Sequence, residues 1–271
     1  MAATTIRVLT LNCLFHGQVR ARLPAIGSLL EKGQFDLVCL QEVAFQRHAR
    51  LLASLMPSYR PPVYRSWALG VMGGLVTFAR AEVKRSGYEM FRRRGDWGTL
   101  GAADRLGRKG FLTTWFEVAG EPLLLVNTHL LANYDEDWSP SNRYAVQQLD
   151  ELNQLGDALG NLEKDALLLV AGDFNVPADH PMLAEFMSRT GLRNAAATPA
   201  ATYRSLNPEV SGQQIDHVFF RHPPGASVST TTKLHFEEKV ALADGRTMYA
   251  SDHFGVEAGI DLLPASALSG E

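Results

Sequence analysis

Six short segments of the sequence carry an acid, an amide or an imidazole at or near the end of an apolar run. Carboxylate and amide oxygens are ligands of hard cations such as Mg²⁺, and an imidazole beside a carboxylate can hold or move a proton. One such residue after a strand is usually a turn or helix-cap residue, but six in one chain indicate a shared site. The segments are Leu11-Asn12-Cys13, Gln41-Glu42-Val43, Asn127-Thr128-His129-Leu130, Gly172-Asp173-Phe174-Asn175, Ile215-Asp216-His217 and Ser251-Asp252-His253-Phe254.

The order of these segments resembles that of the endonuclease/exonuclease/phosphatase superfamily, which includes deoxyribonuclease I, abasic-site endonucleases, inositol polyphosphate phosphatases and neutral sphingomyelinases. The resemblance runs from about Arg7 to Ile260, nearly the whole chain. It implies an α/β fold, a four-layer α/β sandwich in which two mixed β-sheets pack face to face with helices outside. It also implies a metal-dependent phosphoric ester hydrolase with its active site at one end of the sandwich.

The resemblance places the metal site at Asn12, Glu42 and Asp252. A carboxylate suits a hard cation, so we expect Glu42 to be the main ligand of Mg²⁺, with Mn²⁺ or another divalent cation as the alternative. Asn12 would supply a neutral amide oxygen or orient Glu42. Asp252 would complete the set of ligands.

The resemblance also implies five catalytic residues. His253 and Asp216 would form an imidazole–carboxylate pair, in which the carboxylate fixes the tautomer and stabilises the imidazolium. His129 would hydrogen-bond a phosphate oxygen, where charge develops in the transition state. Asp173 and Asn175 are two positions apart, so on an extended segment both side chains would point the same way. Asp173 would align or deprotonate the attacking water, and Asn175 would hold a phosphate oxygen.

Together these roles describe in-line attack of water on phosphorus, with the metal as Lewis acid on the phosphoryl oxygen. Either Asp173 or His253 could take the proton of the water, and we assign the water to Asp173 and the phosphate to His253. His217 follows Asp216 along a strand and therefore faces the other way, so we interpret it as structural.

The elements that must position these residues can be read from the apolar pattern. Leucines and valines spaced by three or four predict a helix over about 142–162, capped by Ser139 or Ser141, and shorter helices are expected near 23–30 and 182–188. The uninterrupted apolar run Ala166–Ala171 is typical of a strand covered on both faces. Further strands are expected at 6–11, 37–40, 75–78, 111–116, 123–127, 215–220, 228–236 and 254–260.

Many strands with helices between them indicate a layered α/β domain. The absence of a linker predicts one catalytic domain over residues 1–262, followed by a flexible tail at 263–271. Cys13 and Cys39 lie in apolar runs and are expected to be buried free thiols. No signal peptide and no apolar stretch of about 20 residues are found, so we expect a soluble, cytoplasmic protein with no obligate protein partner.

The charge of the chain indicates which kinds of substrate or surface it could bind. A pI of about 6.2 does not favour a protein that holds a long nucleic acid by charge alone. The segment from Arg80 to Gly110 has nine basic and four acidic residues, so it is locally positive. This segment is either a solvated face or a docking surface for an anionic substrate or a membrane.

Among the branches of the superfamily, the motifs resemble neutral sphingomyelinases most. Beyond Leu11-Asn12-Cys13 and the His129 motif, Gly95-Asp96-Trp97 followed by Lys109-Gly110 resembles a segment of that branch. Lys109 or Arg108 would then contact the substrate phosphate, or be surface charges. Three aromatic residues are candidate lipid contacts, with core packing as the alternative; they are Trp97, Phe91 and Trp138.

The resulting hypothesis is a Mg²⁺-dependent phosphodiesterase that cleaves a phospholipid headgroup, with peripheral membrane contact. The alternative is a nuclease acting on DNA or RNA, motivated by the basic residues Arg92 to Arg94. A phosphomonoesterase is less favoured. A catalytically inactive binding protein is also less favoured, because no catalytic position is lost.

Overall fold

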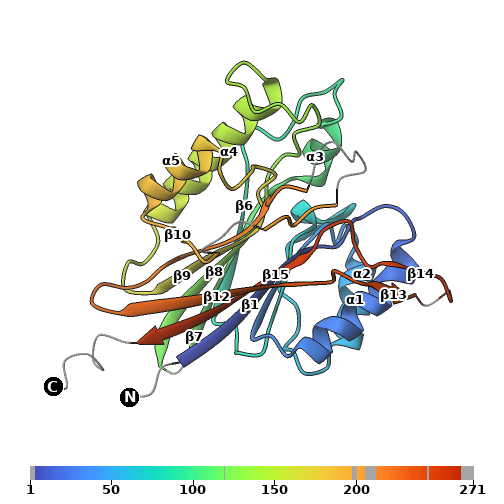
Figure 1. Ribbon diagram of the computed structural model, residues 1–271, viewed down its shortest axis with the longest axis horizontal. Helices are drawn as coiled ribbons and strands as arrows, with labels where there is room; N and C mark the ends of the chain where they lie inside the picture. Colours follow the sequence, from blue (N-terminus) through green and yellow to red (C-terminus); the bar gives the residue numbers. More distant parts are fainter. Residues whose placement is uncertain (1–3, 119, 197–199, 205–211, 243, 264–271) are drawn as a thin grey trace.

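The computed structural model describes residues 4–118, 120–196, 200–204, 212–242 and 244–263. Two large mixed sheets dominate it (Figure 1). The first sheet has the order β12-β15-β1-β2-β5, in which β1 is parallel to β2 and antiparallel to β15. Its strands are β1 (Thr4–Asn12), β2 (Leu37–Gln41), β5 (Val76–Ala79), β12 (Ser227–His235) and β15 (Gly255–Leu263).

The second sheet has the order β10-β11-β9-β8-β7-β6. Its central strands β8 and β9 are parallel, and β11 runs antiparallel to β9. The strands are β6 (Arg85–Met90), β7 (Gly110–Val118), β8 (Glu121–His129), β9 (Leu167–Asp173), β10 (Arg193–Asn194) and β11 (Asp216–Arg221).

The side chains of both sheets alternate between an inner core and an outer one. In β9, Leu167 and Leu169 pack between the two sheets, whereas Leu168 and Val170 pack under helices on the outer face. In β1, Val8 likewise faces the other sheet. This two-sided burial explains why β9 reads as an unbroken apolar run, as the sequence predicts.

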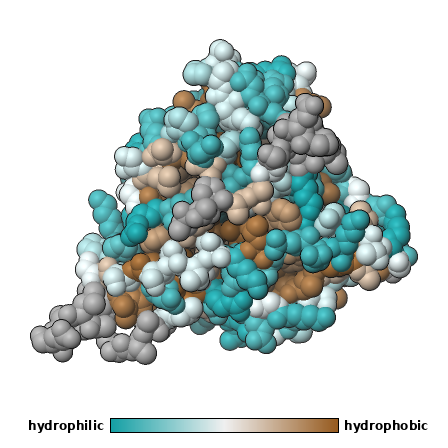
Figure 2. All heavy atoms as spheres, viewed as in Figure 1, coloured by the Kyte–Doolittle hydropathy of each residue, from teal (hydrophilic) through white to brown (hydrophobic). Residues whose placement is uncertain are grey.

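Helices cover the outer face of each sheet and complete four layers. α1 (Val19–Gly33) and α2 (Gln46–Leu55) pack on the first sheet, and α4 (Arg143–Gly160) and α5 (Pro181–Thr190) on the second. Figure 2 shows hydrophilic side chains over the helical margins and apolar ones in the middle of this face. The predicted four-layer sandwich is confirmed.

Two buried amides join the sheets below the end where the motifs lie. The Nε2 of Gln41 donates to Oδ1 of Asn127 (2.9 Å), and Nδ2 of Asn127 donates to the carbonyl of Leu40 (3.2 Å). Both side chains are fully buried, and a buried amide without partners is costly. These bonds therefore favour one relative placement of the two sheets.

Some local elements differ from the sequence prediction. The N-cap of α4 is Asn142, whose side chain accepts from the backbone N–H groups of Tyr144 and Ala145, so the prediction of Ser139 or Ser141 is wrong. Several elements were not predicted, because they lack a long apolar pattern. Among them are α2, β6 and β10, together with a group of short elements. These short elements are β3 (Ser66–Trp67), β4 (Gly70–Val71), the 3₁₀ turn Met72–Gly74, α3 (Ala102–Gly107), β13 (Lys239–Ala241) and β14 (Thr247–Tyr249).

Leu263 belongs to β15, so the predicted tail begins one residue too early. The rest of that prediction, 264–271, lies outside the described residues. Cys13 and Cys39 are buried and free, as expected. In the part of the chain that the structure describes, no helix has the length and apolarity needed to cross a bilayer.

His217 gives the fold a testable pH dependence. Burial lowers its pKa from 6.5 to about 4, and this effect outweighs the hydrogen bond from its Nε2 to the carbonyl of Val176 (3.0 Å), which raises the pKa. The ring is stacked on Phe219. Between these values only the unfolded chain is protonated here, so the free energy of unfolding falls as the pH falls through this window, by about 3 kcal/mol in total.

Urea denaturation at pH 7 and at about pH 4.5 should therefore show a smaller loss of stability for His217→Gln than for the wild type. The partly buried His222 provides the control variant His222→Gln, which should follow the wild type. Equal losses in the wild type and His217→Gln would contradict the assignment.

Candidate active site

Strand ends bring the predicted motifs to one end of the sandwich. β1 ends at Asn12 and its parallel neighbour β2 is followed by Glu42, so both side chains lie at the same edge. β8 and β9 are parallel with His129 opposite Asp173. The first residue of β11, Asp216, is also opposite Asp173.

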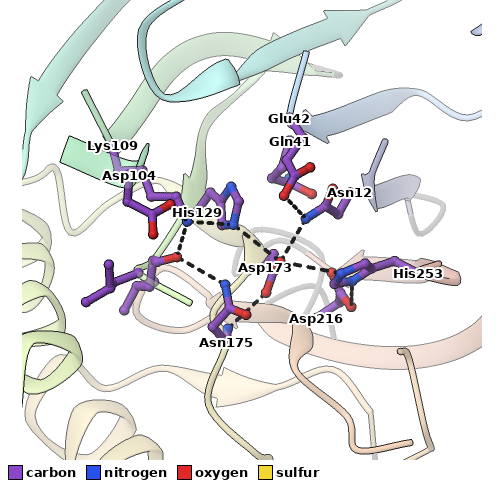
Figure 3. A network of polar contacts seen from close by, with 12 residues as sticks. Asn12, Gln41, Glu42, Asp104, Lys109, His129, Asp173, Asn175, Asp216 and His253 are labelled. Atoms are coloured by element: carbon purple, nitrogen blue, oxygen red, sulfur yellow. Dashed lines mark hydrogen bonds and ion pairs between the residues drawn. The ribbon is translucent and has the colours of Figure 1, made fainter. Parts of the chain in front are cut away.

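A cavity of about 640 Å³ opens at this end. Figure 3 shows the polar side chains converging on Asp173 from both sheets. Asp216 is fully buried behind His253 and is not part of the cavity wall. The predicted residues that line the cavity are Asn12, Glu42, Lys109, His129, Asp173, Asn175, Asp252 and His253.

The carboxylate of Asp173 is the centre of the network. Its Oδ2 accepts a hydrogen bond from Nδ2 of Asn12 (2.9 Å) and lies 3.4 Å from Nε2 of His129 and 3.8 Å from Nε2 of His253. Burial, followed by repulsion from Asp216, raises the pKa of Asp173 to about 7. A carboxyl with such a pKa can accept a proton near neutral pH.

His253 and Asp216 form the predicted pair. Nδ1 of His253 lies 2.8 Å from Oδ2 of Asp216, and both side chains are buried. Burial acts to lower the pKa of His253, but the carboxylates of Asp216 and Asp173 outweigh it and raise the pKa to about 10. The imidazole is therefore a cation at neutral pH, with Nε2–H free to serve as a donor.

His129, in contrast to His253, is neutral. Burial, Lys109 and His253 together hold the pKa of His129 well below its usual value, so the ring is neutral. The ammonium group of Lys109 has three acceptors: Oδ1 of Asp104 (2.7 Å), the carbonyl of Leu130 (2.7 Å) and Nε2 of His129 (2.9 Å). In this arrangement Nε2 accepts, and His129 could donate to a phosphate only from Nδ1.

Glu42 has the properties of a cation ligand. Its carboxylate accepts from Nδ2 of Asn12 (3.2 Å) and from the backbone N–H of Phe15 (2.7 Å), and among the described residues no ion pair involves it. Its φ of +61° is a left-handed conformation that non-glycine residues rarely adopt. The neighbouring chain passes close by, because a Cβ on Gly74 would lie 3.0 Å from Cα of Glu42.

Backbone strain of this kind is typical of functional sites. Carboxylate oxygens are hard donors, so Glu42 fits a divalent cation of the Mg²⁺ type. Asn12 turns its Nδ2 toward Glu42 while its Oδ1 accepts from the backbone N–H of Leu14 (2.9 Å), so of its two predicted roles the orientation of Glu42 fits this geometry. Asp252 is half-buried and lines the same cavity, which is compatible with the predicted set of ligands.

A second geometric group must be considered as a metal site. Asp173, Asp216 and His253 each offer a ligand atom within 4.8 Å of the others. A histidine binds a metal through its neutral imidazole ring, whereas the carboxylates around His253 favour the cationic form of its ring. By geometry these three residues are a second candidate metal site, and by charge they are suited to proton transfer.

Asn175 reaches the cavity differently from the prediction. Its φ is +51°, so the segment is not extended beyond Asp173 and the expected alternation is wrong. The backbone N–H of Asn175 donates to Oδ1 of Asp173 (2.9 Å), and its Nδ2 donates to the carbonyl of Leu130 (3.1 Å). This tight turn, rather than strand geometry, places the amide beside the carboxylate.

Sequence reasoning missed two residues that support the site. Gln148 on α4 donates from Nε2 to the carbonyls of Leu131 (2.8 Å) and Asn175 (2.9 Å), which joins the loops after β8 and β9. Asp104 pairs with Lys109 in a buried ion pair. A buried glutamine on the apolar face of a helix was a usable signal, whereas nothing in the sequence around Asp104 indicated its partner.

Other predictions for the binding region need correction. Arg108 is absent from the cavity wall, and its guanidinium lies 4.3 Å from the ring centre of Trp67. Phe91 is fully buried in the core under α4, so its assignment as a lipid contact is wrong. Trp138 is partly buried and its Nε1 donates to Asn175 (3.3 Å), whereas Trp97 is 64% exposed.

Part of the basic segment is neutralised by neighbouring acids. Arg93 pairs with Asp150 (2.9 Å), and Arg85 pairs with Glu163 (2.6 Å). Lys109 is held by Asp104. These contacts support the interpretation of the segment as an ordinary surface at Arg85 and Arg93, whereas Lys109 is buried and lines the cavity.

Comparison with known proteins identifies the family. The sequence profile of the Endonuclease/Exonuclease/phosphatase family matches residues 9–253. The chain belongs to this family. Its members are phosphoric ester hydrolases that use divalent metals.

Two curated relatives resemble the chain over nearly its whole length. One is the "Putative neutral sphingomyelinase" of Drosophila melanogaster, 29% identical over the whole chain, which spans 64% of that relative's length. The other is the "Inositol phosphosphingolipids phospholipase C" of Schizosaccharomyces pombe, 25% identical over 96% of the chain and 69% of the relative. Both names agree with the predicted resemblance to the sphingomyelinase-like branch.

Two solved structures share the fold at low sequence identity. One is D. rerio TDP2 complexed with single strand DNA product (TM-score 0.73, 19% identity, covering 95% of this chain and 99% of that one). The other is a mutant of the Staphylococcus aureus beta toxin with bound magnesium ions (TM-score 0.71, 17% identity, covering 94% and 99%).

Replacing Glu42 by glutamine tests the metal ligand directly. Glu42→Gln removes the charge but keeps the size, so Mg²⁺ or Mn²⁺ affinity, measured by isothermal titration calorimetry, should fall at least about tenfold. The thermal unfolding transition should persist. Glu136 is an exposed acid that also lines the cavity, so Glu136→Gln is the matched control. Equal losses in both variants would show a general charge effect instead.

Replacing His253 by alanine tests the proton-handling pair. Turnover of bis(p-nitrophenyl) phosphate should fall at least about 10²-fold, as expected for loss of a positioned acid or base. His222→Ala, which alters a histidine outside the cavity lining, should retain activity. Near-normal turnover of His253→Ala would assign His253 to structure.

Proposed function

We propose that this protein is a Mg²⁺-dependent phosphodiesterase that cleaves the headgroup of a phospholipid-like substrate by in-line attack of water on phosphorus. The observation that carries the proposal is the shared cavity of Glu42, Asp173 and His253, which combines an unpaired carboxylate, a carboxyl with a raised pKa and a cationic imidazole. A cation ligand, a base for the water and a donor to the phosphate oxygens each favour attack of water on a phosphodiester.

Glu42 and Asp252 would hold the cation, and Asn12, predicted as a further ligand, would orient Glu42, because its Oδ1 accepts from the backbone N–H of Leu14. When bound there, a divalent metal would supply Lewis-acid stabilisation of the phosphoryl oxygen. The Nδ2 of Asn12 donates to both Glu42 and Asp173, so it orients one carboxylate for the cation and the other for the water.

Asp173 and His253 divide the proton work. Asp173 accepts the proton of the attacking water, because its raised pKa makes it a base suited to neutral pH. His253 keeps its proton on Nε2 and donates a hydrogen bond to a phosphate oxygen as charge develops there. Asn175 is positioned by the turn after β9 to hold a second phosphate oxygen.

Two observations favour a lipid over other phosphodiesters. The names of the two curated relatives both specify a sphingolipid reaction. The cavity wall is also rich in apolar side chains near its opening, including Leu14, Phe15 and Leu69, which suits the apolar part of a lipid better than a nucleotide chain.

A nuclease is the second candidate, favoured by the fold similarity to a TDP2–DNA complex and by the arginines at 92–94. The ion pair of Arg93 weakens it. Monoester cleavage and a cytoplasmic location remain predictions. The inactive binding protein is disfavoured, since the catalytic positions converge.

A substrate panel tests the proposal. Purified protein with Mg²⁺ is incubated with sphingomyelin vesicles, single-stranded DNA and double-stranded DNA, with EDTA as the control. We expect release of the phosphorylated headgroup, abolished by EDTA. Exclusive release of nucleotides would replace the lipid proposal by the nuclease, and absence of any metal-dependent turnover, including that of bis(p-nitrophenyl) phosphate, would favour the inactive protein.

A further inference from the structure

Exposed apolar side chains surround the opening of the active-site cavity. Among the described residues nine large hydrophobic side chains are exposed, and five of these line this one cavity, so the exposure is concentrated there. Isolated exposed apolar residues are ordinary, whereas a group around one opening marks an interaction site. We call these five the mouth residues: Phe15, Phe45, Leu69, Leu106 and Tyr134.

The first half of the mouth is held together by backbone contacts. Leu69 lies in the turn between β3 and β4, and Phe45 in the turn before α2. The N–H of Val71 donates to the carbonyl of Ala44 (3.0 Å), so the two turns are bound to each other. Phe45 and Leu69 are therefore parts of one surface.

Two further contacts connect this surface to α3 and to the catalytic centre. Arg108, at the end of α3, lies over Trp67 on the β3–β4 hairpin, and this brings Leu106 to the same side of the opening. The backbone N–H of Phe15 donates to the carboxylate of Glu42. A molecule bound at the mouth therefore lies directly above the predicted metal ligand.

Positive charge is interleaved with this apolar surface. Two aromatic rings of the cavity lining lie under an arginine guanidinium, and a third arginine, on α3, lies over Trp97. Among the described residues none of these three arginines forms an ion pair with a carboxylate. The pairs are Arg47 over Phe45 (4.5 Å), Arg108 over Trp67 (4.3 Å) and Arg105 over Trp97 (5.2 Å).

We propose that the mouth residues dock the protein on a lipid bilayer that carries anionic phosphate headgroups. Apolar side chains enter the boundary of the acyl chains while arginines contact phosphate, which is the combination expected of a peripheral membrane surface. A headgroup held there faces Glu42 and Asp173 without leaving the bilayer. The inference rests on the proposed lipid substrate and assigns the surface by which that substrate is reached.

The chemistry of the mouth fits a bilayer better than a nucleic acid. A nucleic acid surface needs a dense basic stripe, with apolar side chains playing a minor part. At the mouth leucines and phenylalanines predominate, and the arginines lie over neighbouring aromatic rings. A second copy of the chain could also cover an apolar surface, and gel filtration of the wild type and the variant distinguishes a dimer from a membrane surface.

Vesicle co-sedimentation in EDTA tests the docking surface without turnover. The vesicles contain phosphatidylcholine and phosphatidylserine at about four to one. We compare the wild type with the double variant Leu69→Ser/Leu106→Ser. The matched control is Leu149→Ser on α4, which replaces an exposed leucine outside the cavity lining. All three proteins should unfold at similar temperatures, because the replaced side chains are exposed.

The wild type and Leu149→Ser should bind these vesicles, and the double variant should bind at least about tenfold more weakly. Raising the salt concentration should weaken the binding of the wild type, since screening reduces the arginine–phosphate attraction. Three results would overturn the inference: no binding by the wild type, unchanged binding by the double variant, or a wild-type dimer in gel filtration that the double variant abolishes.

This outcome is separable from that of the proposed function. Absence of vesicle binding by a wild-type protein that still hydrolyses bis(p-nitrophenyl) phosphate with metal would remove the docking surface alone. Vesicle binding with no metal-dependent hydrolysis of any phosphodiester would remove the proposed function and leave the surface.

Discussion

The carboxylate of Asp173 lies where the two sheets meet, and the geometry of the site depends on its contacts. Its Oδ2 accepts from Asn12 of the first sheet at 2.9 Å, and the same oxygen lies 3.4 Å from His129 and 3.8 Å from His253. Asn12 in turn donates to Glu42. One oxygen atom thereby connects the predicted metal ligand with the proton-handling groups.

Burial gives these groups their different chemistry. Asp173, His129 and His253 are all almost fully enclosed, so desolvation acts against every charge and neighbouring groups decide which charges survive. Asp216 and Asp173 keep His253 cationic against the effect of burial, whereas burial, Lys109 and His253 together keep His129 neutral. Two histidines in one cavity therefore differ in charge, one cationic and one neutral, because their surroundings differ.

The sequence was sufficient for the layered fold, since β9 and α4 have clear apolar patterns, and for the convergence of the motifs at strand ends. It was insufficient where tertiary contacts decide. β6 is an exposed edge strand without an apolar run, and Asp104 matters only because the chain returns it to Lys109. Asn175 and Arg108 adopt left-handed conformations that no spacing rule describes, so their side-chain directions could not be predicted.

The most direct test of the account is a double-mutant cycle on Asp173 and His253, with turnover of bis(p-nitrophenyl) phosphate as the readout. If both residues act on one phosphorus within one network, Asp173→Asn combined with His253→Ala should lose little more activity than the more damaging single variant. Losses that multiply, as for independent sites, would contradict the claim that these two residues form one catalytic unit.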